Sequence, residues 1–278
     1  MSLASTAELL RAAQAHNTAV AAFNVLHLET AEGLTAAAEA TGLPVILQIS
    51  ENCVRYHGAL DPIATATLAI ARSSTAPVAV HLDHAEEIDL AFRAIDLGFS
   101  SVMYDGSKLN YSDNVAATRR VVEYATTGSV LVEAELGEVG GKNGAHTPGV
   151  RTDPREAECF VAETGVGALA VAVGSSHAMT ERVAVIDVDL IGRLRDSVAV
   201  PLVLHGSSGV PDALIVRGIR AGLSKINVST HLNRIFTNAI TAYFGENPTT
   251  VDSRRYLAAA RTALGEEAAR LLTLFASH

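Results

Sequence analysis

Tryptophan is absent from the chain, and aromatic residues make up only 5% of its 278 residues. A core with few large rings has to be built from Ala, Val, Leu and Ile, and the hydrophobic content of 49% supplies enough apolar residues for one. Aliphatic residues of this kind fill parallel β-strands and the helices that cover them. The composition therefore favours an α/β fold with a buried parallel sheet.

Positive charge is also scarce. Lys and Arg number 21 against 30 Asp and Glu, the formal net charge is −9, and no Lys/Arg cluster occurs along the chain. Because nucleic-acid binding depends on such clusters, we expect no nucleic-acid partner.

The chain also lacks a signal peptide and any stretch of 18 uninterrupted apolar residues. We therefore expect a soluble, cytoplasmic protein with no membrane partner. The two cysteines, Cys53 and Cys159, are isolated and lack the spacing of a metal site. We interpret them as reduced thiols, as is usual in the cytoplasm.

Short runs rich in Val, Ile and Leu alternate with longer Ala-rich segments of helical period, which predicts repeated strand–helix units. The first strand is followed by no GxGxxG loop, so a doubly wound sheet is disfavoured. We predict an α/β fold in which residues 1–278 form a single (β/α)8 TIM-barrel domain. The predicted strands are Ala19–Val25, Pro44–Ile49, Val78–Leu82, Ser101–Tyr104, Val130–Glu135, Ala168–Val173, Pro201–Leu204 and Ser224–Val228.

Helices are predicted between and beyond these strands. Ser5–His16 is expected to be an N-terminal helix that covers the bottom of the barrel, and Tyr111–Thr126 ends before a glycine. Asp153 precedes Pro154, the pattern of an N-cap followed by proline in the first turn. Thr230–Phe244 and Ser253–Ala276 are predicted to form a C-terminal helical extension.

Four potential metal ligands each close one of the apolar runs: His84, Glu135, His177 and His205. The carboxyl ends of parallel strands meet at one rim of a barrel, where barrel enzymes gather their chemistry. Three imidazoles at that rim suit Zn2+ and leave a position open for water or substrate. The pattern therefore predicts a metal enzyme.

The segment His81-Leu82-Asp83-His84 is the densest polar cluster. An extended backbone puts His81 and Asp83 on one side and His84 on the other. Because the strand ends here, both Asp83 and His84 can still reach the barrel mouth. Asp83 is either a catalytic group or a carboxylate that only orients a histidine.

Glu133 and Glu135 share one face of the fifth strand. One of them can be a ligand and the other a support, or Glu133 can pair with a basic neighbour inside the barrel. Lysine occurs only at positions 108, 142 and 225. Lys225 is the one plausible Schiff-base lysine, but three histidines favour metal polarisation instead.

Two Gly/Ser-rich loops, Gly174–Ser176 and Gly206–Gly209, follow the sixth and seventh strands, and the segment KINVST at 225–230 extends the same rim. Backbone N–H groups of such loops bind phosphate, and phosphate sites are common late in these barrels. Asp105, in an Asp-Gly-Ser turn after the fourth strand, adds a carboxylate.

Jointly these residues resemble the class II, zinc-dependent ketose-bisphosphate aldolases, the family of fructose- and tagatose-bisphosphate aldolases. The resemblance covers nearly the whole chain, and the lack of long insertions is closer to the tagatose-type branch. The segments that carry it are Phe23-Asn24, HLDH at 81–84, VMYDGS at 102–107, VEAELGEVGG at 132–141, the strand ending in His177, PLVLHGSSG at 201–209, KINVST at 225–230 and Asp252–Tyr256.

The resemblance implies a lyase of carbohydrate metabolism, as in glycolysis, that reversibly cleaves a ketose 1,6-bisphosphate or a related ketose 1-phosphate. Its products would be dihydroxyacetone phosphate and an aldehyde. The resemblance also implies a phosphorylated sugar partner, a homodimer or homotetramer, and Zn2+ as cofactor, with a second divalent or a monovalent cation as an option.

Individual residues take roles from the resemblance. His84, His177 and His205 would hold the zinc, and Asp105 and Glu135 match carboxylates at an alternate or second metal position. Asp83 would donate or accept the proton at the C4 oxygen of the substrate. The positions that match substrate-binding residues are Asn24, Ser50, Ala178, Gly206, Ser207, Ser208, Asn227, Val228, Ser229, Thr230 and, at the distal phosphate or in a neighbouring subunit, Arg254.

Three positions depart from the family pattern. Relatives often carry an acidic proton carrier after Gly140-Gly141, where this chain has Lys142–His146, so His146 is the candidate replacement. Relatives usually have Gly where this chain has Ala178, and Asn-Asn where it has Leu26-His27. These departures keep alternatives open: an aldolase for a phosphorylated keto-deoxy sugar acid, a metal-dependent phosphosugar isomerase or hydrolase, or a non-catalytic phosphosugar-binding barrel.

Overall fold

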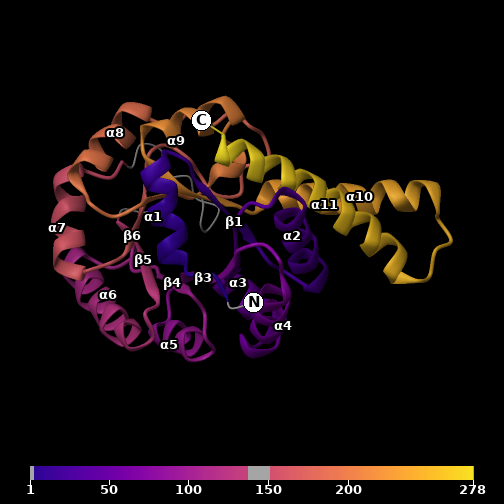
Figure 1. Cartoon of the computed structure of the whole chain (residues 1–278), viewed down its shortest axis with the longest axis horizontal. Helices are drawn as coiled ribbons and strands as arrows, with labels where there is room; N and C mark the ends of the chain where they lie inside the picture. Colours follow the sequence, from indigo (N-terminus) through magenta and orange to yellow (C-terminus); the bar gives the residue numbers. More distant parts are fainter. Residues whose placement is uncertain (1–2, 137–150, 278) are drawn as a thin grey trace.

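The computed structural model describes residues 3–136 and 151–277. Eight parallel strands form a closed barrel in the order β1 to β8, which confirms the predicted (β/α)8 architecture (Figure 1). The strands are β1 (Val20–Asn24), β2 (Val45–Ser50), β3 (Val78–Ala85), β4 (Ser101–Tyr104), β5 (Leu131–Leu136), β6 (Ala168–Val171), β7 (Leu202–Leu204) and β8 (Leu223–Val228).

Helices surround the barrel, and several of them begin after a residue whose side chain caps the first turn. The side chain of Ser5 accepts a hydrogen bond from the amide of Glu8, and that of Asp153 accepts from Arg155 and Glu156, so both predicted helix starts are confirmed. The helices are α1 (Thr6–His16), α2 (Leu28–Thr41), α3 (Glu51–His57), α4 (Asp61–Ser73), α5 (Ile88–Asp96), α6 (Tyr111–Ala125), α7 (Pro154–Thr164), α8 (Val188–Ser197), α9 (Asp212–Ala221), α10 (Thr230–Glu246) and α11 (Ser253–Ala276), with 3-10 turns η1 (Thr126–Gly128) and η2 (Ser207–Gly209).

The lower half of the barrel interior is filled by small and aliphatic side chains. Leu10 and Ala13 of α1 pack into it together with inward residues such as Ile46 and Met103. Helix α1 therefore covers the bottom of the barrel, as predicted, and polar chemistry is confined to the upper half.

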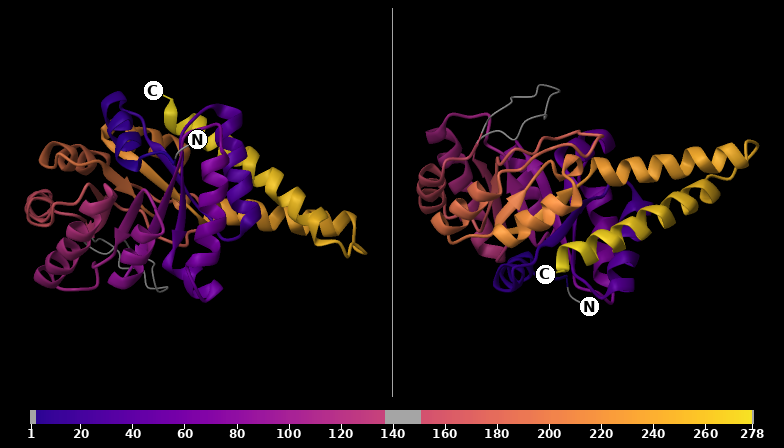
Figure 2. Two further views of the ribbon diagram at one scale, coloured as in Figure 1. Left: turned by 60° about the horizontal axis from the view of Figure 1, so that its bottom comes forward. Right: turned by 90° about the horizontal axis from the view of Figure 1, so that it is seen from above.

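The end of α10 and the beginning of α11 project from the barrel as a two-helix arm, and the rest of α11 packs back against α2 and β1 (Figure 2). The rings of Phe244 and Tyr256 lie 5.0 Å apart between the two helices. The predicted C-terminal helical extension is therefore present, and α11 begins at the predicted residue because the side chain of Asp252 caps it.

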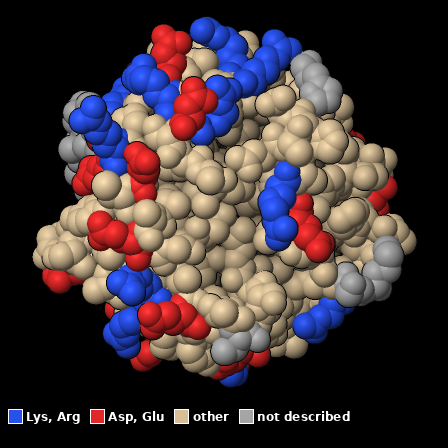
Figure 3. All heavy atoms as spheres, turned by 60° about the vertical axis from the view of Figure 1, so that its left-hand side comes forward, with Lys and Arg blue, Asp and Glu red and all other residues tan. Residues whose placement is uncertain are grey.

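The surface carries charges of both signs. On the face shown in Figure 3, Lys and Arg side chains lie next to Asp and Glu around the margin, and the centre is formed largely by uncharged residues. Within the described parts of the chain, no helix combines the length and apolarity that a bilayer crossing requires.

Candidate active site

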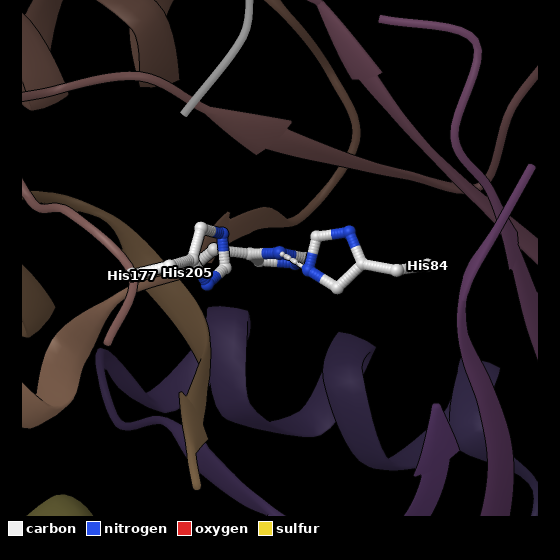
Figure 4. Close-up of side chains that lie close together, drawn as sticks. All are labelled: His84, His177 and His205. Carbon is white, nitrogen blue, oxygen red and sulfur yellow. Dashed lines mark hydrogen bonds between the residues drawn. The ribbon is translucent and has the colours of Figure 1, made fainter. Parts of the chain in front are cut away.

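Three histidines meet at the carboxyl ends of the barrel strands. His84 belongs to β3, His177 follows β6 and His205 follows β7, and their rings point toward one another (Figure 4). One ring nitrogen from each lies within 4.8 Å of the other two. His205 is fully buried, and the His84 side chain is 19% exposed. The structure therefore brings together the three histidines predicted from separate apolar runs.

An irregularity in β3 aims both Asp83 and His84 at the barrel mouth. The prediction ended this strand at Leu82, but it continues to Ala85, and its register against β4 shifts by one residue between Leu82 and Ala85. His84 takes a left-handed backbone conformation with φ of 52°. Such a bulge interrupts the strict alternation of side chains along a strand. The strain of an L-residue in this conformation, about 1–2 kcal/mol, is the kind found at functional sites.

Two of the histidines hold their outer ring nitrogen against a carboxylate. His84 Nδ1 lies 2.8 Å from Asp105 Oδ2, and His205 Nε2 lies 2.9 Å from Glu133 Oε1. If both outer nitrogens donate, the inner nitrogens, His84 Nε2 and His205 Nδ1, present lone pairs to each other at 2.9 Å. A cation bound between them would remove that repulsion. Carboxylates that orient histidines in this way are typical of metal sites, so the residues present fit a divalent metal.

A second group of potential ligands shares His84. Its nitrogen and carboxylate oxygens of Asp105 and Glu135 also lie within 4.8 Å of one another. Glu135 is fully buried, and its Oε2 is 3.8 Å from His205 Nδ1. Asp105 Oδ1 accepts hydrogen bonds from the amide and hydroxyl of Ser107, which fixes the carboxylate beside His84. The two groups form one continuous cluster that can hold a metal at either position.

Amide side chains surround the carboxylate of Asp83. Asn227 Nδ2 donates to Oδ1 at 3.3 Å, and Asn24 Nδ2 and Gln48 Nε2 both donate to Oδ2 at 3.4 Å. Asp83 Oδ1 is 4.0 Å from His84 Nε2. Three side-chain amides thus hold the Asp83 carboxylate in place beside the histidines.

A buried ion pair lies below the histidines. Lys225 Nζ is 2.7 Å from Glu133 Oε2, and both side chains are fully buried. Lys225 also lies 3.4 Å from Nε2 of His81, whose Nδ1 is 2.8 Å from the hydroxyl of Ser101. Burial, with the nearby positive charge of Lys225, holds the pKa of His81 well below its usual range. Glu133 therefore pairs with a basic neighbour while it supports His205, and His81 belongs to this layer.

A cavity of about 160 Å³ opens on one side of the histidines. Gly206 lines this cavity and has a left-handed backbone with φ of 65°. A Cβ at this position would lie 2.6 Å from the carbonyl carbon of Ser176, so the loop requires glycine. The lining residues are Asn24, Gln48, Ser50, Asn52, Asp83, His84, His177, Ala178, Gly206, Ser207, Ser208, Asn227, Ser229 and Thr230. Most of the predicted substrate-binding positions thus line this one cavity. The pattern missed Gln48, although it lies two residues before Ser50 and therefore on the same face of β2.

Val228 and Arg254 lie away from this cavity. Side chains alternate along β8, so Asn227 points inward while Val228 is buried in the core between barrel and helices. Arg254 is the second residue of α11, which starts at the outer end of the arm (Figure 2). A contact from Arg254 to substrate would therefore have to come from a neighbouring subunit. His146 lies outside the described residues.

A second cavity, of about 230 Å³, opens on the other side of His84 and His177. The described residues that line it are Ser50, Glu51, Asn52, Arg55, His84, Glu86, Asp105, Lys108, His177 and Ala178. Arg55 and Glu86 could not be recognised from the sequence, because each looks like an ordinary charged residue of a helix or loop surface. We call the first cavity the proximal cavity and this one the distal cavity.

Ala178 offers a test of backbone strain at the rim of both cavities. It is exposed and left-handed, with φ of 58°. We expect Ala178→Gly to raise the free energy of unfolding by roughly 0.5–1 kcal/mol, because glycine adopts this conformation without strain. Urea denaturation measures the change.

The matched control is Ala36→Gly, at an exposed position inside α2. Glycine there should lower the free energy of unfolding by about 0.5–1 kcal/mol. Equal destabilisation by both substitutions would contradict the assignment of strain to Ala178.

Comparison with known proteins gives one family and several similar structures. Residues 4–278 match the family described as fructose-bisphosphate aldolase class-II. The crystal structure of the YdjI aldolase from Escherichia coli K12 is 32% identical, with a TM-score of 0.84 over 99% of this chain and 98% of that one. Fructose-bisphosphate aldolase (Fba) from Campylobacter jejuni is 19% identical, with a TM-score of 0.83 over 99% and 95% of the two chains, and this likeness concerns the fold alone.

Proposed function

Because the chain belongs to the class II fructose-bisphosphate aldolase family and is an aldolase, we propose that it is a zinc-dependent enzyme for a ketose phosphate. The substrate would be a ketose 1,6-bisphosphate or a related ketose 1-phosphate, cleaved reversibly to dihydroxyacetone phosphate and an aldehyde. The observation that carries this proposal is the position of Asp83 in the proximal cavity beside three convergent histidines, two of which, His84 and His177, also line the distal cavity.

We propose His84, His177 and His205 as the zinc ligands. Their nitrogen donors suit Zn2+, and the carboxylates of Asp105 and Glu133 orient two of the rings. Asp105 and Glu135 would serve a second or alternate cation position. When bound, the metal would supply Lewis-acid stabilisation of the negative charge that develops on the C2 oxygen as the C3–C4 bond breaks.

The chain's own residues would position the substrate. Gly206, Ser207 and Ser208 line the proximal cavity together with Ser229 and Thr230 at the start of α10, where the Ser229 side chain makes no cap and the amide of His231 donates to Ser208 Oγ at 3.1 Å. Backbone N–H groups at such a helix start favour a phosphate, and we assign the dihydroxyacetone phosphate half to this side. Asn24 and Ser50 line the same cavity.

Proton transfer at the C4 oxygen is proposed for Asp83. Its carboxylate, which accepts hydrogen bonds from three side-chain amides, would remove the C4 hydroxyl proton in cleavage and return it in condensation. The same donors keep the carboxylate in place beside His84.

The proposed function is tested by two assays on one preparation. We expect the protein to exchange a carbon-bound proton of dihydroxyacetone phosphate with deuterium oxide and to condense dihydroxyacetone phosphate with an aldehyde. A phosphosugar isomerase or hydrolase would form no carbon–carbon bond, and a binding protein would do neither. If metal-loaded protein catalyses neither exchange nor condensation, the proposal is refuted.

His146 is proposed as the group that moves this carbon-bound proton, because it occupies the segment where relatives carry an acidic carrier. We expect His146→Ala to slow exchange by roughly 10²-fold while the metal stays bound. Wild-type exchange in His146→Ala would remove His146 from the mechanism.

A further inference from the structure

We infer that this enzyme prefers an aldehyde without a phosphate, so that its natural substrate class is a ketose 1-phosphate with an uncharged, hydroxylated tail. The inference rests on the proposed function and narrows its substrate. It comes from the distal cavity, where both cations among the described lining residues are already paired with a carboxylate of the protein.

The two positively charged side chains of the distal cavity are both paired. Lys108 Nζ is 2.7 Å from Glu86 Oε1, and Arg55 is bonded to Glu51 Oε1. Glu86 and Glu51 themselves line the cavity. An incoming phosphate would therefore lie next to a carboxylate at each cation, and like charges in contact disfavour binding.

Two backbone amides at the edge of this cavity are occupied as well. Glu51 Oε2 accepts the amide of Glu86 at 2.6 Å and that of Glu87 at 3.4 Å. The Glu51 side chain is only 6% exposed, so its position is fixed by burial and by these bonds. The neighbouring amides that would cradle a phosphate thus already bind a buried carboxylate.

The balance of charge in the distal cavity points the same way. Against Arg55 and Lys108, the described lining contributes the carboxylates of Glu51, Glu86 and Asp105. The paired carboxylates can accept hydrogen bonds from hydroxyl groups, and the paired cations can donate to them. The side-chain amide of Asn52 adds a further acceptor and a further donor. The lining therefore suits a polyhydroxylated tail better than an anion.

Arg254, which the family resemblance places at the distal phosphate, is also paired with a carboxylate. Arg254 donates to both carboxylate oxygens of Asp252, with its Nε 3.0 Å from Oδ1 and its Nη2 2.8 Å from Oδ2. If a neighbouring subunit presents this segment to the site, it presents a carboxylate along with the guanidinium. Arg254 therefore adds no unpaired charge for a second phosphate.

The test compares two aldehydes in condensation with dihydroxyacetone phosphate by the metal-loaded enzyme. We expect kcat/KM for glyceraldehyde, assayed as both enantiomers, to exceed that for glyceraldehyde 3-phosphate by about tenfold or more. A preference for glyceraldehyde 3-phosphate would overturn the inference. If that preference then disappeared in Arg254→Ala, Arg254 would be the residue that binds the second phosphate.

A charge-release variant tests the cause. Glu86→Gln removes the carboxylate and frees Lys108, so kcat/KM for glyceraldehyde 3-phosphate should rise by about three- to tenfold relative to glyceraldehyde. Glu32→Gln, which breaks an exposed ion pair with Arg261 on α11, is the matched control and should leave the ratio unchanged. An unchanged ratio in a folded Glu86→Gln would overturn the argument from paired charges.

Proton exchange separates this inference from the proposed function. Dihydroxyacetone phosphate exchange in deuterium oxide does not involve the aldehyde. Exchange together with a preference for the phosphorylated aldehyde would overturn the inference and leave the aldolase proposal standing. Absence of both exchange and condensation would overturn both.

Discussion

Asp83→Ala is expected to lower the rate of aldol cleavage by roughly 10²-fold or more while the metal stays bound. The loss is expected because Asp83 is the carboxylate placed beside His84, with its oxygens held by Asn24, Gln48 and Asn227. Cleavage is measured by coupled detection of dihydroxyacetone phosphate, and metal content is measured on the same sample.

Proton exchange provides an internal control for this variant. The C4 hydroxyl proton takes no part in exchange at dihydroxyacetone phosphate, so Asp83→Ala should retain exchange close to that of the wild type. If the variant loses its metal along with its activity, Asp83 is a support for the ligands and not the proton acceptor.

Lys225→Met is expected to lower the free energy of unfolding by about 3–5 kcal/mol. The substitution leaves the carboxylate of Glu133 buried without its cation, and removal of one partner from a buried ion pair carries this cost. Urea denaturation with all variants in excess chelator measures it, since bound metal would add its own stabilisation.

Two comparisons isolate the buried charge as the cause. Lys225→Met combined with Glu133→Gln leaves no uncompensated charge and should recover much of the loss. Glu32→Gln removes one partner of an exposed pair and should cost less than about 1 kcal/mol. A cost below 1 kcal/mol for Lys225→Met alone would contradict the fully buried pairing of Lys225 with Glu133.

Much of the fold could be predicted because local chemistry marks it. Helix α11 begins after Asp252 and α7 begins after Asp153 because these side chains cap backbone amides two or three residues further on. The eight strands follow from aliphatic runs that suit a buried parallel sheet. Such signals are local, so the sequence contains them directly.

The convergence of the three histidines could be predicted for a related reason. Each of His84, His177 and His205 ends a strand or follows one, and closure of the barrel brings all strand ends to one rim. The left-handed conformation of His84 could not be predicted, since it depends on the register shift between β3 and β4.

The distal cavity was missed because its contacts join separate segments. Lys108 meets Glu86 across 22 positions, and Glu51 reaches the amide of Glu86 across 35. No spacing rule connects these residues, and each alone resembles a solvated surface charge. The pairing that decides the charge of the cavity therefore becomes visible only in the folded chain.

The central claim, metal-dependent aldol chemistry at the three histidines, is tested most directly by metal analysis of the purified protein before and after chelation. We expect about one zinc per chain, loss of condensation and of proton exchange in EDTA, and recovery on addition of Zn2+. The affinity for zinc should fall as the pH falls, because histidine binds metal in its neutral form. Protein that contains no zinc and keeps full aldolase activity in EDTA would contradict the claim.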